Sequence, residues 1–227
     1  IVGFGKWVFG SSIITFIVVQ GDRLLLGGMI TPRDLGVYTI AFVIASTIRR
    51  LASDVMSSLL FPAISEVVRE NPENLKNIYY KMRQYIDWLS AFVVGVLASF
   101  SDLIVNILYD DRYSDAGWML KILVVPMLFV GTKLADSCFL ALGYSRLVMM
   151  LGLMSAIFLL VMTPAMYSYY GIVGALYAIA ASSLIKIPVV FVKMSNQNIF
   201  SFKKEFLHVP FFVLIYYICE ALQDLSQ

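Results

Sequence analysis

The sequence has 227 residues, of which 60% are apolar and only 14% are charged, and its mean hydropathy is +0.83. An ordinary soluble domain carries about 25% charged residues, and in water a chain of this size could not bury so much apolar surface. A net charge of +2 excludes the concentrated basic face of a nucleic-acid-binding protein. We therefore predict an integral membrane protein.

Six segments qualify as transmembrane helices and a seventh is marginal, because a bilayer core needs about 20 apolar residues per helix. They span residues 7–29, 35–61, 85–108, 118–142, 147–167, 172–193 and 206–222, the last being short and containing Pro210. Runs rich in Gly, Pro, Asn and Asp separate them. No run alternates as a membrane barrel requires, and long apolar runs in lipid satisfy their backbone as helices.

The predicted fold is therefore an all-α, polytopic transmembrane helix bundle with six to seven spans. Residues 1–195 form a six-helix transmembrane bundle, and residues 196–227 form a cytoplasmic linker and an extra transmembrane helix. The chain opens with Ile1 and Val2 rather than methionine, so we expect further sequence on its N-terminal side.

Basic residues in the connecting segments predict the orientation. Nine of them share a side with the chain start and only Arg33 and Arg112 lie on the other; the nine are Lys6, Arg69, Lys76, Lys81, Arg83, Arg146, Lys193, Lys203 and Lys204. Since Lys and Arg concentrate in cytoplasmic loops, the chain start and the predicted loop at 66–84 are cytoplasmic.

Charged residues also lie deep inside the predicted spans, where they usually face a cavity or a partner. Five are basic and three are acidic: Arg23, Arg49, Arg50, Lys133 and Lys186, with Asp22, Asp54 and Asp136. We expect the bases to bind an anionic substrate in a central cavity. The acids hold the bases in place or carry a coupling ion.

Helical spacing gathers these charges into polar stripes. Ser46, Arg50, Ser53 and Ser57 recur on one face of the second span, with Arg49 beside them. Ser11, Thr15 and Asp22 share a face of the first span, and similar polar groups surround Lys133 in the fourth span and Lys186 in the sixth, which makes four stripes. We predict that the stripes converge on a water-filled, net-positive vestibule.

Neutralised pairs within one helix are the alternative reading of these charges. Arg50 and Asp54 are four residues apart, and Lys133 and Asp136 are three apart. Such pairs could lock helices together without lining a cavity. Cys138 and Cys219 lie inside apolar stretches without a metal-type spacing, so no disulfide, metal site or cofactor is expected.

Several ordered motifs carry a family resemblance. They are Gln20-Gly21-Asp22-Arg23-Leu24-Leu25-Leu26-Gly27, Leu35-Gly36-Val37-Tyr38, Phe61-Pro62-Ala63, Leu108-Tyr109-Asp110-Asp111-Arg112-Tyr113, Ala141-Leu142-Gly143-Tyr144 and Tyr170-Gly171-Ile172-Val173-Gly174-Ala175. Together they resemble the polysaccharide flippases of the O-antigen and exopolysaccharide type, within the multidrug/oligosaccharidyl-lipid/polysaccharide superfamily. Asp110 stands where that family often has glycine.

The resemblance implies more than the residues alone. Such proteins have two helical bundles around a central cavity, and this chain would be the C-terminal half. They move an undecaprenyl-pyrophosphate-linked glycan to the outer leaflet of a bacterial or archaeal cytoplasmic membrane by alternating access. The implied partners are that anionic lipid-linked glycan, membrane lipids, an N-terminal half of the same chain and polysaccharide polymerase machinery.

Two other functions remain open from the sequence. A multidrug or cation antiporter of the same superfamily would favour intramembrane acids, whereas five bases face three acids here. A membrane glycan-transfer enzyme would need a large aqueous loop with catalytic residues. The single histidine, His208, has no nucleophile or acid motif beside it. We therefore expect a transporter and no catalytic residues.

Overall fold

A computed structural model of the chain describes residues 2–197 and 208–224. Throughout those residues the regular structure is helical, which confirms the predicted all-α class. The helices are α1 (Val2–Gly27), α2 (Pro32–Val55), α3 (Phe61–Glu70), α4 (Leu75–Ser99), α5 (Ser101–Leu108), α6 (Ala116–Val124), α7 (Thr132–Ala141), α8 (Ser145–Leu184), α9 (Ile187–Asn196) and α11 (His208–Asp224). The predicted linker falls largely at 198–207, outside the described residues.

Helices α2 and α3 form one continuous rod through the π-helical turn η1 (Met56–Leu60). The rod begins at Thr31, whose hydroxyl caps the Asp34 amide at 3.2 Å, and Pro32 follows at a position where no amide proton is needed. The predicted helix exit at Phe61-Pro62 is wrong. The π turn accommodates the missing amide of Pro62, and the helix continues to Glu70.

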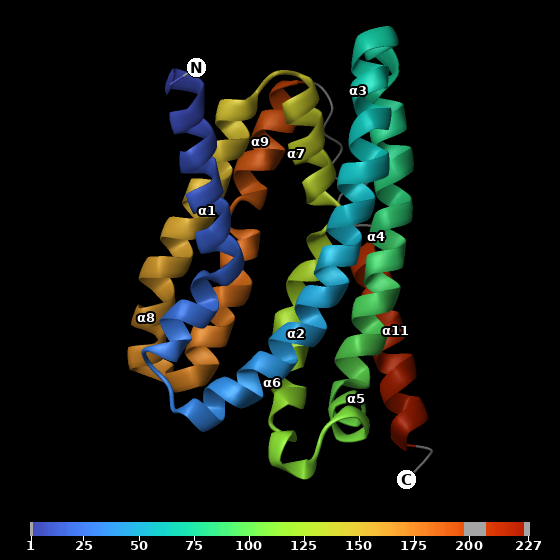
Figure 1. Ribbon diagram of the computed structural model, residues 1–227. Coiled ribbons are helices and arrows are strands. Elements are labelled where there is room, and N and C mark those ends of the chain that lie inside the picture. The colour runs from blue at the N-terminus through green and yellow to red at the C-terminus, as the bar shows by residue number, and fades with distance from the viewer. Residues whose placement is uncertain (1, 198–207, 225–227) are drawn as a thin grey trace.

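The predicted loop at 66–84 is also wrong. It is a helical hairpin in which a short 3-10 turn, η2 (Pro72–Asn74), joins α3 to α4. Figure 1 shows α3 and the start of α4 projecting together at one end of the molecule. Arg83 lies in α4 and is buried, so it leaves the count of loop cations. Eight against two (nine minus one) still predicts the same orientation.

Two of the predicted spans are bent. Helices α4 and α5 meet at 66° around Phe100, and α6 meets α7 at 44° across the 3-10 segment η4 (Val125–Phe129). Pro126 opens η4, and its missing amide explains why the α-helix ends there.

Helix α8 contains a hairpin at Gly171, where φ is +63° and ψ is −151°. Only glycine adopts this conformation without strain. The limbs 145–170 and 172–184 therefore run in opposite directions, as the gold and orange ribbons in Figure 1 show. This confirms the predicted break between the fifth and sixth segments.

Two helical stretches in the described part of the chain are long and apolar enough to cross a membrane: Pro32–Glu70, and Ser145–Asn196, which includes the hairpin at Gly171. Counting each bent pair as one span raises the number to four. Helix α11 is apolar but shorter. The six to seven spans stay a prediction.

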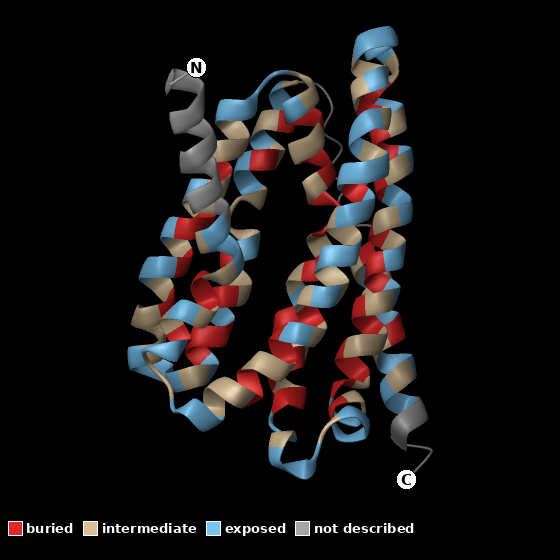
Figure 2. Ribbon diagram, in the orientation of Figure 1, coloured by how far each residue is buried: buried red, intermediate tan, exposed pale blue. Residues whose placement is uncertain are grey.

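The helices pack around two apolar clusters. The first core cluster joins α2, α4, α6 and α8 and includes Tyr38, Phe42, Val94, Leu120 and Leu176. The second joins α3, α4, α7 and α9 and includes Ile64, Tyr79, Leu134, Phe139 and Val190. Figure 2 shows many buried residues along α4 and α6, and many exposed residues along α3 and the projecting end of the molecule.

A charged layer separates the two clusters. We define it as Arg49, Arg83, Asp87, Lys133 and Lys186. Arg49, Asp87 and Lys186 lie between first-cluster and second-cluster residues along α2, α4 and α8–α9. Arg83 bonds Asp87, and Lys133 lines a pocket with Arg49 and Lys186, so these two belong to the same layer. It contains the candidate functional site.

Candidate functional site: a basic pocket in the charged layer

Three of the predicted bases, Arg49, Lys133 and Lys186, line one pocket. They come from α2, α7 and the α8–α9 junction, whose other lining residues include Thr132 and Ser183. The polar stripes of the second, fourth and sixth predicted spans therefore converge. The pocket volume is only about 70 Å³, whereas sites for drug-sized ligands measure about 300–1,000 Å³.

Polar contacts around the pocket link the three elements. The Lys133 ammonium donates a hydrogen bond to the Ser53 hydroxyl at 2.8 Å, which joins α7 to α2. The Lys186 ammonium pairs with Asp136 at 2.5 Å, and both side chains are 18% exposed. Arg49 Nε is buried, and none of the residues that the structure describes forms a hydrogen bond with it.

These contacts exclude both neutralised pairs within one helix. Asp136 pairs with Lys186, fifty residues away, instead of Lys133. Among the described residues, no ion pair joins Arg50 to Asp54, and both side chains are exposed on α2. The stripe prediction put Arg50 on the cavity face, but its neighbour Arg49 lines the pocket.

Asp22 and Arg23 lie apart from the pocket lining, where α1 meets α2. The buried Asp22 carboxylate accepts a hydrogen bond from the Tyr38 hydroxyl at 2.5 Å and one from its neighbour's amide at 2.8 Å. The Arg23 guanidinium lies 3.9 Å from the centre of the Phe42 ring, a cation–π contact. This pair ties α1 to α2.

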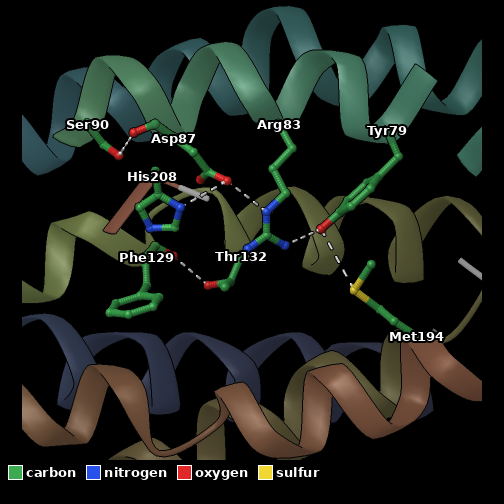
Figure 3. Close-up of polar contacts among 8 residues, drawn as sticks. All are labelled: Tyr79, Arg83, Asp87, Ser90, Phe129, Thr132, Met194 and His208. Carbon is green, nitrogen blue, oxygen red and sulfur yellow. Dashed lines mark hydrogen bonds and ion pairs between the residues drawn. The ribbon is translucent and has the colours of Figure 1, made fainter. Parts of the chain in front are cut away.

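A second charged cluster on α4 and α11 was missed at the sequence level (Figure 3). The Arg83 guanidinium donates to Asp87 at 3.1 Å and to the Tyr79 hydroxyl at 2.6 Å. His208 of α11 lies 3.7 Å from Asp87, and the side chains of all four residues are almost completely buried. The i,i+4 spacing of Arg83 and Asp87 indicates such a pair on a helix. The predicted loop at 66–84 placed Arg83 outside any helix, so this spacing did not count.

The basic pocket carries an excess of positive charge. Three cations line it and one carboxylate, Asp136, is paired with them, which leaves two charges over when one is subtracted from three. Low-dielectric walls strengthen the attraction of such charges for an anion. The arrangement suits binding of an anionic group and gives a cationic ligand no free carboxylate pair.

Long apolar helices that enclose a basic pocket are features of a membrane protein. A family model described as polysaccharide biosynthesis protein matches residues 1–117, just over half of the chain. The chain therefore belongs to this family of polysaccharide biosynthesis proteins, which confirms the resemblance that the sequence motifs carry. That it is a C-terminal half stays a prediction.

One curated relative is the amylovoran biosynthesis protein AmsL of Erwinia amylovora. It is 25% identical over 122 residues, which cover 54% of this chain and 31% of that protein. The chain thus matches less than a third of the relative's length. No solved structure matches the chain.

Proposed function

We propose that this chain is part of a transporter that moves a lipid-linked anionic saccharide across the cytoplasmic membrane. The cargo is an undecaprenyl-pyrophosphate-linked repeat unit, moved by alternating access, and the chain catalyses no covalent step. The observation that carries the proposal is the convergence of Arg49, Lys133 and Lys186 on one pocket inside an apolar bundle. Membership of a polysaccharide biosynthesis family supports it.

The pocket binds the pyrophosphate in this scheme. A pyrophosphate cannot cross hydrocarbon unaided, and buried ammonium and guanidinium groups replace the water that it loses. The pocket is too small for a saccharide in this conformation. Cargo entry therefore requires the bundle to open, and the bend beside η4 and the interruption of regular helix at the α8–α9 junction provide places where it can.

The test is glycan export by the full-length polypeptide that contains this chain. We expect Arg49→Ala with Lys133→Ala to reduce export more than tenfold, because hydrogen bonds to charged groups contribute about 1.5–3 kcal/mol each. Arg49→Lys should retain part of the activity. The matched control is Lys121→Ala, which removes a lysine paired with Asp102 at 2.8 Å outside the pocket.

Each variant is checked for its level in the membrane and for a monodisperse peak in detergent. Normal export by the well-folded double variant would overturn the proposal. Equal loss in the Lys121→Ala control would show that any intramembrane lysine has the same effect and would also overturn it.

A further inference from the structure

Within the described residues, the cluster on α4 and α11 contains two groups with no hydrogen-bond partner. Asp87 Oδ2 accepts from Arg83 at 3.1 Å, but its other carboxylate oxygen, Oδ1, is buried without a hydrogen bond. Neither ring nitrogen of His208 has a hydrogen-bond partner, although the imidazole is 1% exposed. Buried polar groups are nearly always paired, so this carboxylate oxygen and this imidazole are unusual among the described residues.

The groups that face His208 come from several elements. Helix α4 contributes Asp87, Arg83 and Tyr79, and η4 contributes the Phe129 ring at 5.7 Å and the nearby Leu128 carbonyl, which does not reach hydrogen-bond geometry. The Tyr79 hydroxyl contacts the uncharged Met194 of α9 at 3.7 Å. Within residues 2–197 and 208–224, the charges beside the imidazole are therefore those of Arg83 and Asp87.

One added proton would strengthen the attraction between these two groups. At 3.7 Å, His208 Nδ1 and Asp87 Oδ2 are too far apart for a hydrogen bond. The neutral imidazole has a single N–H; a second proton gives it a positive charge and makes both ring nitrogens donors, whereas a proton on the carboxyl makes that group a donor to the imidazole. After a small rotation of the side chains, the protonated imidazole forms a charge-assisted hydrogen bond to the carboxylate, and the protonated carboxyl forms a hydrogen bond to the imidazole. Either bond joins α4 to α11.

The same carboxylate touches the wall of the basic pocket. A Cβ built on Gly131 would collide with Asp87 Oδ1 and come within 3.4 Å of Arg83 Cγ, so α4 rests directly against Gly131. The residues on either side of this glycine, Val130 and Thr132, line the pocket together with Lys133. A movement of Asp87 is therefore transmitted to the pocket through one residue.

We propose that the Asp87–His208 pair is a proton-binding site, separate from the basic pocket, and that the proton it takes up is the ion coupled to transport. The coupling part rests on the proposed function. Uptake of the proton closes the gap between His208 of α11 and Asp87 of α4. The resulting shift of Asp87 against Gly131 changes the shape of the basic pocket. Release of the proton on the other side of the membrane resets the pair.

Nuclear magnetic resonance of the histidine ring tests the proton site without any transport measurement. The full-length polypeptide is labelled at histidine, and the signal lost in His208→Gln belongs to the only histidine of this chain. We expect that signal to titrate with pH, and Asp87→Asn to move the titration. Asp102→Asn is the matched acid-to-amide control on α5, and it should leave the titration unchanged.

Trp88 gives an independent readout of the α4–α11 contact. Its ring meets Phe211 of α11 edge-on, with 4.4 Å between ring centroids. With the other tryptophans replaced, acidification should change Trp88 fluorescence in the parent protein and not in Asp87→Asn. A His208 signal that does not titrate, or one that is insensitive to Asp87→Asn, overturns the proton site.

Transport in vesicles then tests the coupling. We expect an imposed proton gradient to accelerate glycan export by the parent and by Asp102→Asn, and to have no effect on Asp87→Asn or His208→Gln. If the gradient still accelerates export in both variants, the coupling role is refuted. If His208 titrates as expected but the parent moves no glycan, the proposed function fails and the proton site stands.

Discussion

Substituting Gly174 by alanine should destabilise the α8 hairpin, whereas the same change at Gly36 should stabilise the protein. A Cβ on Gly174 would meet the Met166 carbonyl oxygen, with the Tyr170 Cβ at 2.7 Å and the Met166 carbonyl carbon at 3.0 Å. Ordinary contact begins at 3.4 Å, so the limbs must separate by roughly 0.7 Å at the Tyr170 contact alone. Two of these atoms are backbone and cannot turn aside.

The free energies can be compared directly. Overpacking costs about 1–3 kcal/mol, and a backbone obstacle belongs at the upper end of that range. Replacing glycine by alanine inside a helix contributes about 1 kcal/mol in the other direction. We expect Gly174→Ala to lower the free energy of unfolding by about 2 kcal/mol. Gly36 has no atom within 4 Å of its Cβ position, so Gly36→Ala should raise it by about 1 kcal/mol.

Reversible unfolding in mixed micelles, followed by tryptophan fluorescence, measures both variants under the same conditions. The expected changes in the free energy of unfolding have opposite signs in the two variants, and this difference in sign is the decisive result. A Gly174→Ala protein at least as stable as Gly36→Ala would refute the close approach of the two limbs.

Three further variants test contacts of the charged residues and the hairpin. Tyr38→Phe removes the hydroxyl that donates to the buried carboxylate of Asp22 and should cost about 1–3 kcal/mol of stability in the same unfolding assay; an unchanged value would contradict the contact. Asp136→Ala should cost about 1.5–3 kcal/mol of stability, because it leaves the ammonium of Lys186 unpaired. Adding Lys186→Met should recover part of that stability. A double variant that is less stable than the single one would argue against the pair. Gly171→Ala should cost about 1–3 kcal/mol, because φ of +63° with ψ of −151° is strained for any residue with a Cβ; thermal unfolding equal to that of the parent would exclude this backbone conformation.

Local patterns predicted the helices and the turn glycines well, because both depend on short stretches of sequence. Apolar length locates the helical segments, and Gly143 and Gly171 both adopt positive φ at predicted breaks. Helix ends were less predictable. The projecting hairpin of α3 and α4 continues through polar residues that composition assigns to a loop, because the two helices pack against each other there.

The choice between neighbouring cations could not be made from periodicity. Arg49 and Arg50 differ by about 100° around the helix, and Ser53 is four residues from one and three from the other, so both fit one stripe. Lys133, eighty residues away, selects the Arg49 side by bonding Ser53. The Asp87–His208 contact joins residues 121 positions apart, and no local pattern predicts such a contact.

The charged layer has a mechanical consequence. Regular α-helix is interrupted at or near it in three places: η1, η4 and the junction at Ile185–Lys186. Backbone hydrogen bonding is already irregular there, and polar side chains can exchange partners with water as apolar ones cannot. The two core clusters can therefore tilt as blocks about the charged layer between them. Under the proposed function, such rocking would widen the basic pocket for its anion while each apolar block keeps its own packing intact.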